Sequence, residues 1–560
     1  MSAARTTPDP VPDGTRRSRM SRRRLLAYAG AGGTVAALGV TAASRLRLSG
    51  ETTGEQLTST ARLPRPFEVP LPVPPAATPV SSANGVDTYE LEQREARLEI
   101  LPGLRTTVWG YDGLFPGRTL VGRRDRRTVV RLRNRLPVPT STHLHGGVTP
   151  PDSDGYPTDL LLPEGAAGRR DWTTSMSHGS GHGDHGDHGD GSRPAGEAPE
   201  GWTFSRGERE YEYPLDQPAA TLWYHDHRMD FSAPQVWRGL AGFFLVRDDE
   251  EEALGLPEGE RDVPLMLCDR SFEEDGSFAY PSLDPTLTEK AGVEDAYHAG
   301  VLGDVQLVNG APWPEFEVTG ARYRLRLLNA ANARRYRLAL EDGEGGRRVP
   351  LVQIGSDCGL LDRPVTHETL TMAPAERFDV VVDFSRYPAG SELTLVNTLG
   401  EGDMRKVMRF RVKGRRRDDS RVPARLVTPD RVSRRQAVEE RSFDFRMTTE
   451  GGHSMWTVNG RPFSTDGVWA APRLDTLEVW RFTSDFHHPV HLHLAHFKVL
   501  SRSGGAPAAS DAGWKDTVDV RPYEVVEVLV RFRGYKGRYM MHCHNLEHED
   551  MAMMANFDIV

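Results

Sequence analysis

The sequence predicts an all-β protein built from several sandwich or barrel domains. Its 560 residues are too many for one hydrophobic core and suggest about three or four domains. Gly (55) and Pro (40) are plentiful, so turn signals are frequent, whereas long stretches with helical periodicity are scarce. Short strands separated by frequent turns are typical of β-sandwiches and Greek-key barrels. The clearest predicted strands are Thr128–Leu132, Phe243–Val246, Tyr323–Leu328 and Asp379–Phe384.

Residues 1–45 are predicted to be a twin-arginine signal peptide. Arginines at positions 22 to 24 precede a modestly apolar run from Ala27 to Ala43, and small residues at its end could mark cleavage. The alternative is an N-terminal membrane anchor, but a run of fewer than about 20 residues that is rich in Gly, Ala and Thr is a poor permanent span. We therefore expect export to the cell envelope or the exterior, with no stable membrane span in the mature chain.

The remaining segments follow from composition. Residues 46–82 are rich in Pro, Thr and Ser and are predicted to form an extended arm. The acidic stretch Asp248–Asp262 and the arginine-containing stretch Lys413–Leu426 are predicted to be linkers. These linkers divide the rest of the chain into three domains, at residues 83–250, 262–413 and 427–560.

A faint internal repeat connects the second and third domains. Val308-Asn309-Gly310 and Val458-Asn459-Gly460 each precede a predicted strand. That strand leads to Asn329–Ala333 in the first case and to a histidine run from His488 in the second. We therefore expect a metal site in the third domain and none in the second, which would act as a spacer.

The most informative motif lies in the third domain, where His542-Cys543-His544 is followed by His548 and Met553. Successive side chains of a strand point to opposite faces, so Cys543 points away from His542 and His544. A thiolate, an imidazole and a more distant thioether are the ligands of a blue-copper electron-transfer site. The two histidines on the other face could serve a second metal site behind the strand.

Three further His-X-His pairs occur along the chain. A single pair is usually coincidental, but four pairs, one with a central cysteine, predict a metal cluster. Imidazole is a good ligand for copper, and thiolate with thioether favours copper over harder cations. The pairs are far apart in sequence, so the fold must bring the two ends of the chain together. The further pairs are His143/His145, His225/His227 and His491/His493, the last of which follows His488.

With these motifs the chain resembles the bacterial three-domain multicopper oxidases, of the laccase, spore-coat-laccase, bilirubin-oxidase and o-aminophenol-oxidase type. The similarity extends from about Leu63 to Val560. The resemblance implies three cupredoxin-like Greek-key β-sandwich domains, with a copper cluster shared between the first and third. The stretches that carry it are Trp109–Gly117, His143–Gly147, Trp223–His227, His488–His493 and His542–Met553, the last two being the most specific.

The resemblance also implies four copper ions and their ligands. The type 1 copper would be held by His488, Cys543 and His548, with Met553 as a weak axial ligand that lowers the potential. The type 2 copper would take His143 and His491. The pair of type 3 coppers would take His145, His225, His227, His493, His542 and His544.

Two carboxylates resemble positions that relatives use to deliver protons. Glu549 follows a predicted type 1 ligand, and Asp154 lies shortly after the first His-X-His pair. The alternatives are a solvated carboxylate for Glu549 and a turn residue for Asp154. Asp226 lies between two predicted ligands, so it should face away from the metal and serve the structure.

The function implied by the resemblance is a laccase-like oxidation of small aromatic donors. Electrons from phenols or aromatic amines would arrive singly at His488 or His548, near the surface, and pass through Cys543 to His542 and His544. Four electrons would reduce dioxygen to water. The alternatives are an oxidase of cuprous or manganous ions and a copper-free structural protein of the cell envelope. A copper nitrite reductase fits less well, because such chains are shorter and lack this set of pairs.

Three further features complete the prediction. The insertion at residues 178–191 contains His178, His182, His185 and His188, which either capture copper or belong to a flexible solvated loop. Cys268 and Cys358 are either paired in a disulfide or buried as thiols. The net charge of -9 argues against nucleic acid as a partner.

Overall fold

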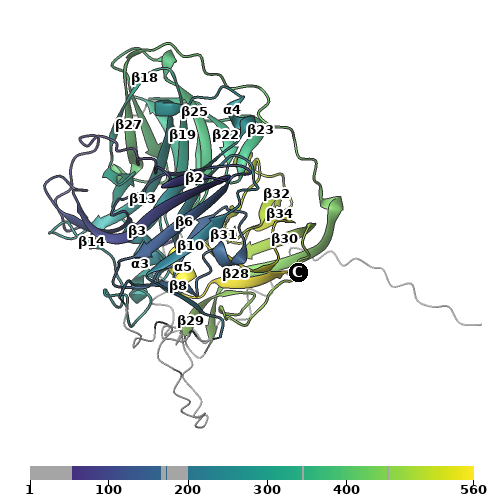
Figure 1. The fold of residues 1–560 in the computed structure, drawn as a ribbon. Helices are drawn as coiled ribbons and strands as arrows, with labels where there is room; N and C mark the ends of the chain where they lie inside the picture. The colour runs from purple at the N-terminus through teal and green to yellow at the C-terminus, as the bar shows by residue number, and fades with distance from the viewer. Residues whose placement is uncertain (1–52, 166–171, 173–197, 199, 344–345, 451–452) are drawn as a thin grey trace, which may run out of the picture. The chain divides into compact units, whose positions relative to one another are not determined.

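The computed structural model describes residues 53–165, 172, 198, 200–343, 346–450 and 453–560. The predicted signal peptide (1–45) and the histidine-rich insertion (178–191) lie outside the described residues. The described chain consists mainly of strands that form three successive pairs of sheets, here called the first, middle and third sandwiches (Figure 1). This confirms the predicted fold class.

The first sandwich spans residues 81–247. One sheet has the order β10 (Glu208–Tyr213), β6 (Arg127–Asn134), β3 (Val86–Leu98) and β2 (Ser81–Ala83), with β4 (Thr106–Tyr111) beside β3. The other has the order β5 (Leu120–Arg123), β12 (Ala241–Arg247), β11 (Ala220–Asp226) and β7 (Thr142–His145). Aromatic and aliphatic side chains such as Tyr111, Leu132 and Phe244 fill the space between the sheets. Charged pairs such as Arg131–Glu210 occupy alternate positions, as expected for a sheet with one solvated face.

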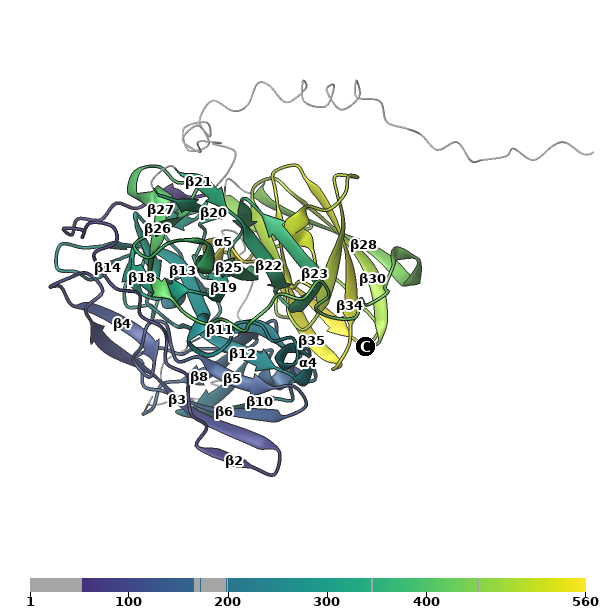
Figure 2. The same cartoon turned by 90° about the horizontal axis from the view of Figure 1, so that it is seen from above.

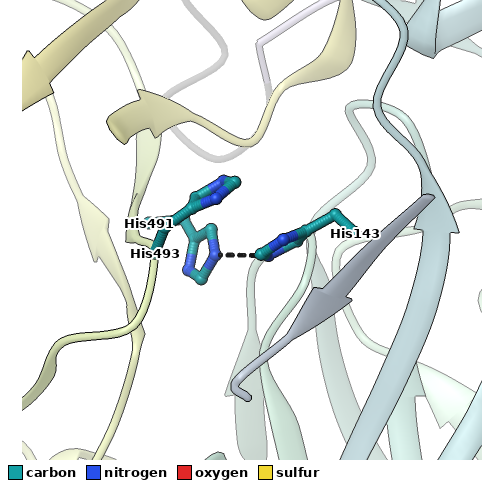
Figure 3. Close-up of side chains that lie close together, drawn as sticks. All are labelled: His143, His491 and His493. Carbon is teal, nitrogen blue, oxygen red and sulfur yellow. Dashed lines mark hydrogen bonds between the residues drawn. The ribbon is translucent and has the colours of Figure 1, made fainter. Parts of the chain in front are cut away.

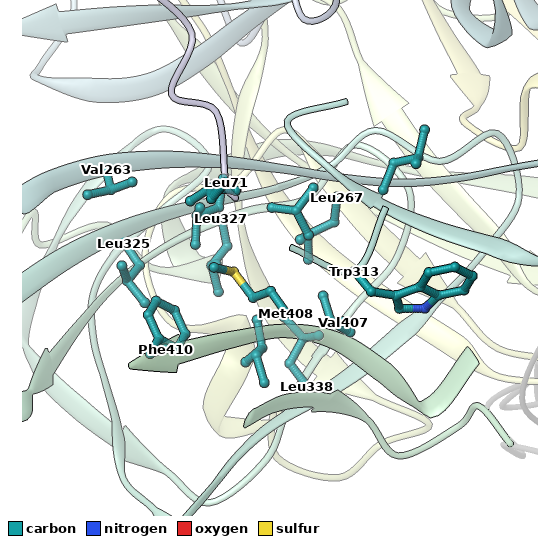
Figure 4. Close-up of a cluster of buried hydrophobic side chains, with 14 of the residues drawn as sticks. Leu71, Val263, Leu267, Trp313, Leu325, Leu327, Leu338, Val407, Met408 and Phe410 are labelled. Carbon is teal, nitrogen blue, oxygen red and sulfur yellow. The ribbon is translucent and has the colours of Figure 1, made fainter. Parts of the chain in front are cut away.

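The middle sandwich spans residues 262–415. One sheet has the order β17 (Ala311–Pro312), β16 (Val305–Val308), β13 (Asp262–Phe272), β19 (Arg322–Asn329), β25 (Arg377–Asp383), β22 (Leu351–Ser356) and β23 (Gly359–His367), with β14 (Phe278–Ala279) beside β13. The other has the order β18 (Glu315–Gly320), β27 (Lys406–Arg415), β26 (Glu392–Asn397), β20 (Tyr336–Asp342) and β21 (Arg347–Val349), with β24 (Leu370–Met372) beside β20. Figure 4 shows part of its apolar core, including Leu327, Met408 and Phe410.

The third sandwich spans residues 437–559. One sheet has the order β29 (His453–Val458), β28 (Ala437–Glu450), β30 (Thr476–Ser484), β34 (Val525–Phe532) and β32 (His496–Arg502). The other has the order β33 (Thr517–Val520), β31 (His488–Leu492), β35 (Gly537–Cys543) and β36 (Met554–Ile559). Cys543 and Met553 belong to the core between these sheets, so one predicted metal site is built into this hydrophobic core.

Short elements connect the sandwiches. The arm contributes β1 (Glu55–Gln56), which pairs with β15 (Val301–Leu302) of the middle sandwich, while β8 (Asp159–Leu162) pairs with β9 (Thr203–Arg206). The α-helices are α3 (Ser232–Trp237), α4 (Asp249–Glu252) and α5 (Leu546–Asp550). The 3-10 turns are η1 (Pro151–Ser153), η2 (Gly259–Arg261), η3 (Asp295–Tyr297), η4 (Phe384–Arg386), η5 (Gly402–Arg405), η6 (Arg434–Gln436) and η7 (Ala509–Asp511). No helix of the described chain is long and apolar enough to cross a bilayer.

The internal repeat has a structural counterpart in two Asn-Gly turns. Asn309 and Asn459 both have positive φ values, of 50° and 54°. The Asn309 side-chain oxygen accepts a hydrogen bond from the backbone of Met266, and that of Asn459 accepts one from the backbone of Asp444, each at 2.8 Å. Positive φ at the first turn residue is the reason that Asn-Gly suits such tight turns.

The stretch Asp248–Asp262, predicted to be a linker, is partly buried. It contains α4, and Glu251 in this helix is 3% exposed because it accepts hydrogen bonds from Arg324 and Arg326 of β19. Asp262 is the first residue of β13 and also accepts hydrogen bonds from Arg326. The acidic composition therefore reflects ion pairing between the first and middle sandwiches and not solvent exposure.

Candidate metal centres

The predicted histidine ligands come from two pairs of strands, one in the first sandwich and one in the third. β7 and β11 are antiparallel neighbours, and their register sets His143 opposite His225. β31 and β35 are also antiparallel neighbours, and their register sets His491 opposite His542. Since side chains alternate along a strand, each His-X-His pair presents both imidazoles on one face.

The two pairs of strands present their imidazoles to each other. His143 Nε2 lies 3.3 Å from His491 Nε2, and the dashed line in Figure 3 joins the two rings. His542 Nε2 lies 3.3 Å from His227 Nε2 and 3.2 Å from His493 Nε2. Nitrogen atoms at this spacing can both lie within the usual metal–nitrogen distance of about 2.0–2.1 Å of one shared ion.

Among the buried nitrogens of the same cluster that lack a hydrogen-bond partner are His145 Nδ1, His225 Nε2 and His544 Nε2. The centroids of these three rings lie 5.1 to 5.7 Å apart. An unpaired buried polar atom is costly, so such atoms need an explanation. A bound metal ion supplies it, because each nitrogen would then donate its lone pair.

Backbone carbonyl oxygens accept hydrogen bonds from the other ring nitrogen of several cluster histidines. The Nδ1 atoms of His143 and His491 donate to the carbonyl oxygens of Asp154 and Asp516, at 2.5 and 2.9 Å. His225 Nδ1 donates to the Asp226 carbonyl at 2.9 Å. A donor bond at one nitrogen fixes the tautomer and leaves the lone pair of the other nitrogen free for a metal.

Burial keeps the cluster histidines neutral. Removal from water lowers the pKa of His225 to about 3 and that of His227 to about 4, from an ordinary value of 6.5. The pKa values of His143, His145, His491, His493 and His544 are lowered well below the ordinary value for the same reason. Neutral imidazole is the form that binds metal.

A second centre surrounds Cys543. Its Sγ lies 3.4 Å from His488 Nδ1 and 3.6 Å from His548 Nδ1, and these two nitrogens are 3.1 Å apart. Met553 is fully buried in the same core. Its backbone carbonyl accepts a hydrogen bond from the Cys543 N–H, and its backbone N–H donates one to the His548 carbonyl. Burial raises the pKa of the Cys543 thiol well above its ordinary value, so a bound cation would be needed to hold the thiolate.

Both histidines of the cysteine centre, predicted as the entry port for electrons, are covered by other residues. His488 and His548 are both 0% exposed. The Trp456 ring stacks on His548 with centroids 3.7 Å apart, and the Ala299 carbonyl oxygen of the middle sandwich accepts a hydrogen bond from His548 Nε2.

The two carboxylates predicted to carry protons both lie in the histidine cluster. Asp154 Oδ2 accepts a hydrogen bond from His493 Nδ1 at 2.6 Å, while its Oδ1 has no partner among the described residues. Glu549 Oε2 lies 3.0 Å from His542 Nδ1, and Oε1 lies 3.6 Å from His227 Nδ1. Burial raises the pKa of Asp154 well above its ordinary value. Glu549 is 1% exposed, so it is not the solvated carboxylate of the alternative reading.

Asp226 has the structural role expected of it. Its carboxylate accepts hydrogen bonds from the backbone N–H groups of Ser141 and Arg228 and from the side chain of Gln235. Cys268 and Cys358 are free, buried thiols and form no disulfide. Burial raises the pKa of Cys268 to about 11.

The sequence did not reveal Asp516 or Asp485. Asp516 Oδ1 lies 3.0 Å from His145 Nε2, and Asp485 Oδ1 lies 3.1 Å from His488 Nε2. No motif marks Asp516, which reaches the cluster because β33 pairs with β31 and sets His491 opposite Thr517. Asp485 lies three residues before His488, and this spacing is the one feature of the sequence that could have indicated its contact with His488.

Comparisons with known proteins agree with this geometry. Two family models described as multicopper oxidase match the chain, one at residues 93–180 and 197–251 and the other at residues 431–560. A laccase of Bacillus stratosphericus is 36% identical over 551 residues, which cover 88% of this chain and 98% of that protein. A laccase of Bacillus subtilis is 34% identical over 545 residues, which cover 87% of this chain and 97% of that protein.

The solved structures include the same kind of protein. The crystal structure of a laccase from Pediococcus acidilactici is similar with a TM-score of 0.73 and 28% identity, covering 90% of this chain and 96% of that one. The regions that the two family models match include all twelve predicted metal ligands. The chain therefore belongs to the multicopper oxidase family.

Proposed function

We propose that the protein is a laccase-like oxidase that takes electrons singly from phenols or aromatic amines and reduces dioxygen to two waters. The observation that carries this proposal is the position of Cys543. Its side chain lies with His488 and His548, whereas its neighbours His542 and His544 lie in the histidine cluster on the other face of β35. One short peptide segment thus joins two centres of different chemistry.

The family implies copper, and the donor set fits four ions. The cysteine centre would hold one ion through His488, Cys543 and His548, with the buried Met553 as a candidate for a weaker fourth ligand. His143 and His491 would hold the type 2 ion. The remaining ligands fall into two sets of three, His145, His225 and His544, and His227, His493 and His542. When bound, copper accepts single electrons at the cysteine centre and supplies the four that dioxygen needs at the cluster.

The polypeptide provides the connection between the centres. Besides the covalent path from Cys543 to its neighbours, the Cys543 carbonyl oxygen accepts a hydrogen bond from His542 Nδ1 at 3.1 Å. Asp154 would hold a proton for the cluster, since burial raises its pKa, whereas Glu549 would pass protons on as a carboxylate, since His227 and His542 outweigh burial and lower its pKa. Each contacts a cluster histidine, and neither is in contact with bulk solvent. A buried carboxylate that can hold a proton close to the reaction is suited to general acid catalysis.

The donor class is inferred from the cover over the cysteine centre and from the laccase relatives. Trp456 covers His548, so a donor would not bind the metal itself. Electron transfer without metal binding (outer-sphere transfer) from an aromatic molecule would then suffice. An oxidase of metal ions is the second candidate. Asp485 Oδ1 lies 3.1 Å from His488 Nε2, and its side chain is only partly buried, so a carboxylate that could attract a metal ion lies beside the cysteine centre.

We also propose that the protein leaves the cytoplasm by the twin-arginine route, which carries folded proteins. The paired arginines at the N-terminus support this proposal. Replacing Arg22 and Arg23 by Lys should retain the protein in the cytoplasm, as measured by cell fractionation. Unchanged export of that variant would contradict the proposal.

The test of the oxidase function is oxygen consumption by copper-loaded protein with 2,6-dimethoxyphenol, together with the visible spectrum. We expect a blue absorption band and oxygen uptake, both lost in Cys543→Ser. Cys268→Ser, at a buried thiol of the middle sandwich, is the matched control and should keep both. Uptake only with cuprous or manganous ions would favour the second candidate. A colourless protein that does not load copper would point to a copper-free structural role.

A further inference from the structure

We propose that Arg377, in the middle sandwich, is a positioning residue for the histidine cluster and acts through Asp516. The inference rests on the proposed function, because it assumes that the cluster histidines hold copper. It also changes the role of the middle sandwich, which the sequence suggested to be a spacer. Three observations carry it: the place of Asp516 between two ligands, the contacts of Arg377, and the anchoring of the Asp516 backbone.

Asp516 contacts one predicted type 3 ligand and one predicted type 2 ligand. Its Oδ1 lies 3.0 Å from His145 Nε2, a predicted type 3 ligand. Its backbone oxygen accepts a hydrogen bond at 2.9 Å from Nδ1 of His491, a predicted type 2 ligand. If His145 Nε2 donates to Asp516, the lone pair of His145 is on Nδ1, which is the buried nitrogen without a partner. Asp516 thereby sets the tautomers of both imidazoles.

Arg377 holds the Asp516 carboxylate from the opposite side. Nη1 donates to Oδ1 at 2.7 Å and Nη2 donates to Oδ2, so the contact is bidentate. Thr517 Oγ1 also donates to Oδ1, at 2.8 Å, and Cys358 Sγ lies 3.4 Å from Oδ2. A carboxylate has about four acceptor positions, so these donors leave it little freedom to turn.

The guanidinium of Arg377 is itself fixed by all three sandwiches. Arg377 is 0% exposed. Nε donates to the Thr221 carbonyl of the first sandwich at 3.1 Å, and Nη1 and Nη2 donate to the carbonyls of Ala375 and Asp357 in the middle one, at 2.9 and 3.0 Å. With Asp516 from the third sandwich, each of the five N–H donors of the guanidinium has an acceptor.

The backbone around Asp516 is anchored to the middle sandwich as well. Asp357 Oδ2 accepts hydrogen bonds from the backbone N–H groups of Asp516 and Thr517, at 3.3 and 3.4 Å, and Asp357 Oδ1 accepts one from the backbone of Arg377. The middle sandwich thus fixes both the side chain and the backbone of the residue that orients His145 and His491. Without Arg377, the Asp516 carboxylate would be free to turn, and the two imidazoles would lose their fixed orientation.

The experiment compares Arg377→Met and Arg377→Lys with wild type after copper loading. The readouts are copper ions per chain, the type 2 copper signal in electron paramagnetic resonance, and the blue band of the cysteine centre. We expect Arg377→Met to keep the blue band but to retain cluster copper about 10-fold less well against a chelator, a typical effect of losing an outer contact to a metal ligand. Arg377→Lys keeps the charge without the bidentate geometry and should give a shifted type 2 signal.

Arg326→Met is the matched control. Arg326 is also 0% exposed and pairs with Asp262, Glu251 and Asp379, none of which touches a predicted ligand. This variant should unfold at a lower temperature than wild type while its copper content and type 2 signal stay unchanged. That outcome separates a general loss of stability from an effect on the cluster.

The inference is overturned if folded Arg377 variants keep wild-type copper content and an unchanged type 2 signal. If Arg377→Met does not fold, Arg377→Lys alone decides, and an unshifted signal in it is equally negative. A wild-type protein that shows neither the blue band nor the type 2 signal would instead defeat the proposed function. The two failures are therefore distinguishable.

Discussion

The middle and third sandwiches share a strand arrangement and differ in the side chains that follow it. In the middle sandwich β13 runs parallel to β19, and in the third sandwich β28 runs parallel to β30. In each, an Asn-Gly turn lies beside the first strand of the pair. After β30 the chain supplies predicted metal ligands, whereas β19 ends at Asn329 and is followed by Asn332. Asn332 Nδ2 donates to Glu547 Oε1 of α5, the helix that carries His548. In the middle sandwich the same arrangement therefore contacts the helix of the candidate metal centre and holds none of the predicted ligands; Figure 2 shows the middle sandwich (teal to green) next to the third (yellow-green to yellow).

The largest expected effect on oxygen uptake comes from helix α5. One of its carboxylates contacts the histidine cluster, and another contacts the middle sandwich. Glu549 contacts the histidine cluster, whereas Glu547 is held by Asn332 and Tyr280 of the middle sandwich. We expect Glu549→Gln to lower the rate of oxygen uptake by about 10²–10⁴-fold, the usual contribution of a positioned acid, and to leave the blue band in place. Stopped-flow reoxidation and steady-state oxygen uptake would measure it.

Glu547→Gln is the matched variant for that prediction. Its Oε1 accepts hydrogen bonds from Asn332 and Tyr280, which the amide oxygen of Gln can accept as well, so only the bond that the Val301 backbone donates to Oε2 is lost. Its rate of oxygen uptake should stay within about 10-fold of wild type, below the range typical of a lost catalytic acid. Equal losses in the two variants would mean that α5 is disturbed as a whole and that Glu549 has no special part in proton delivery.

The ion pairs between the first and middle sandwiches predict how stability depends on pH. Burial alone would raise the pKa of Glu251, but Arg324 and Arg326 together lower it to about 2, from an ordinary value of 4.5. A carboxyl with a depressed pKa stabilises the fold above its unfolded pKa, and this contribution disappears as the pH falls toward the folded value. The shift corresponds to about 3 kcal/mol at neutral pH.

Denaturant unfolding of wild type and Glu251→Gln between pH 7 and pH 2 would test this dependence. We expect the difference in unfolding free energy to be largest at neutral pH and to shrink from about pH 4.5 downward, where Glu251 of the unfolded chain begins to take up a proton that the folded protein does not. A difference that stays constant over this range would contradict the assigned cause.

The smallest effects are expected at the two Asn-Gly turns. Asn309→Ala and Asn459→Ala each force Ala into positive φ, which costs about 1–2 kcal/mol, and each removes a side-chain bond to the neighbouring strand. Asn309 is 1% exposed, whereas Asn459 is exposed to solvent, so water can replace the lost bond only at Asn459. Thermal unfolding should therefore show a larger loss for Asn309→Ala. Equal losses would indicate that backbone strain dominates.

The sequence predicted the fold class and the ligand residues because their signals are local. A His-X-His pair needs only strand alternation to place both imidazoles on one face, and Cys543 between His542 and His544 needs only the same rule. The sequence could not predict Asp516, Arg377 or Trp456 as parts of the centres, because each arrives through a strand pairing or a sandwich boundary.

The acidic stretch around Glu251 shows a related limit. Its composition is that of a solvated linker, and only the buried arginines of β19 explain why it is structured. Charge counts along a chain do not tell whether a carboxylate has a buried partner. The cover of His548 by Trp456 likewise depends on how β29 packs, which the sequence does not reveal.

The distribution of ligands along the chain has a consequence during synthesis. β7 carries the first His-X-His pair and β35 the last, and about 400 residues separate them, which a ribosome needs roughly 20–80 s to make. For that time the imidazoles of the first sandwich have no partners from the third. The histidine cluster is thus completed only after the middle and third sandwiches have been translated. A metal ion that binds earlier would find only the histidines of the first sandwich.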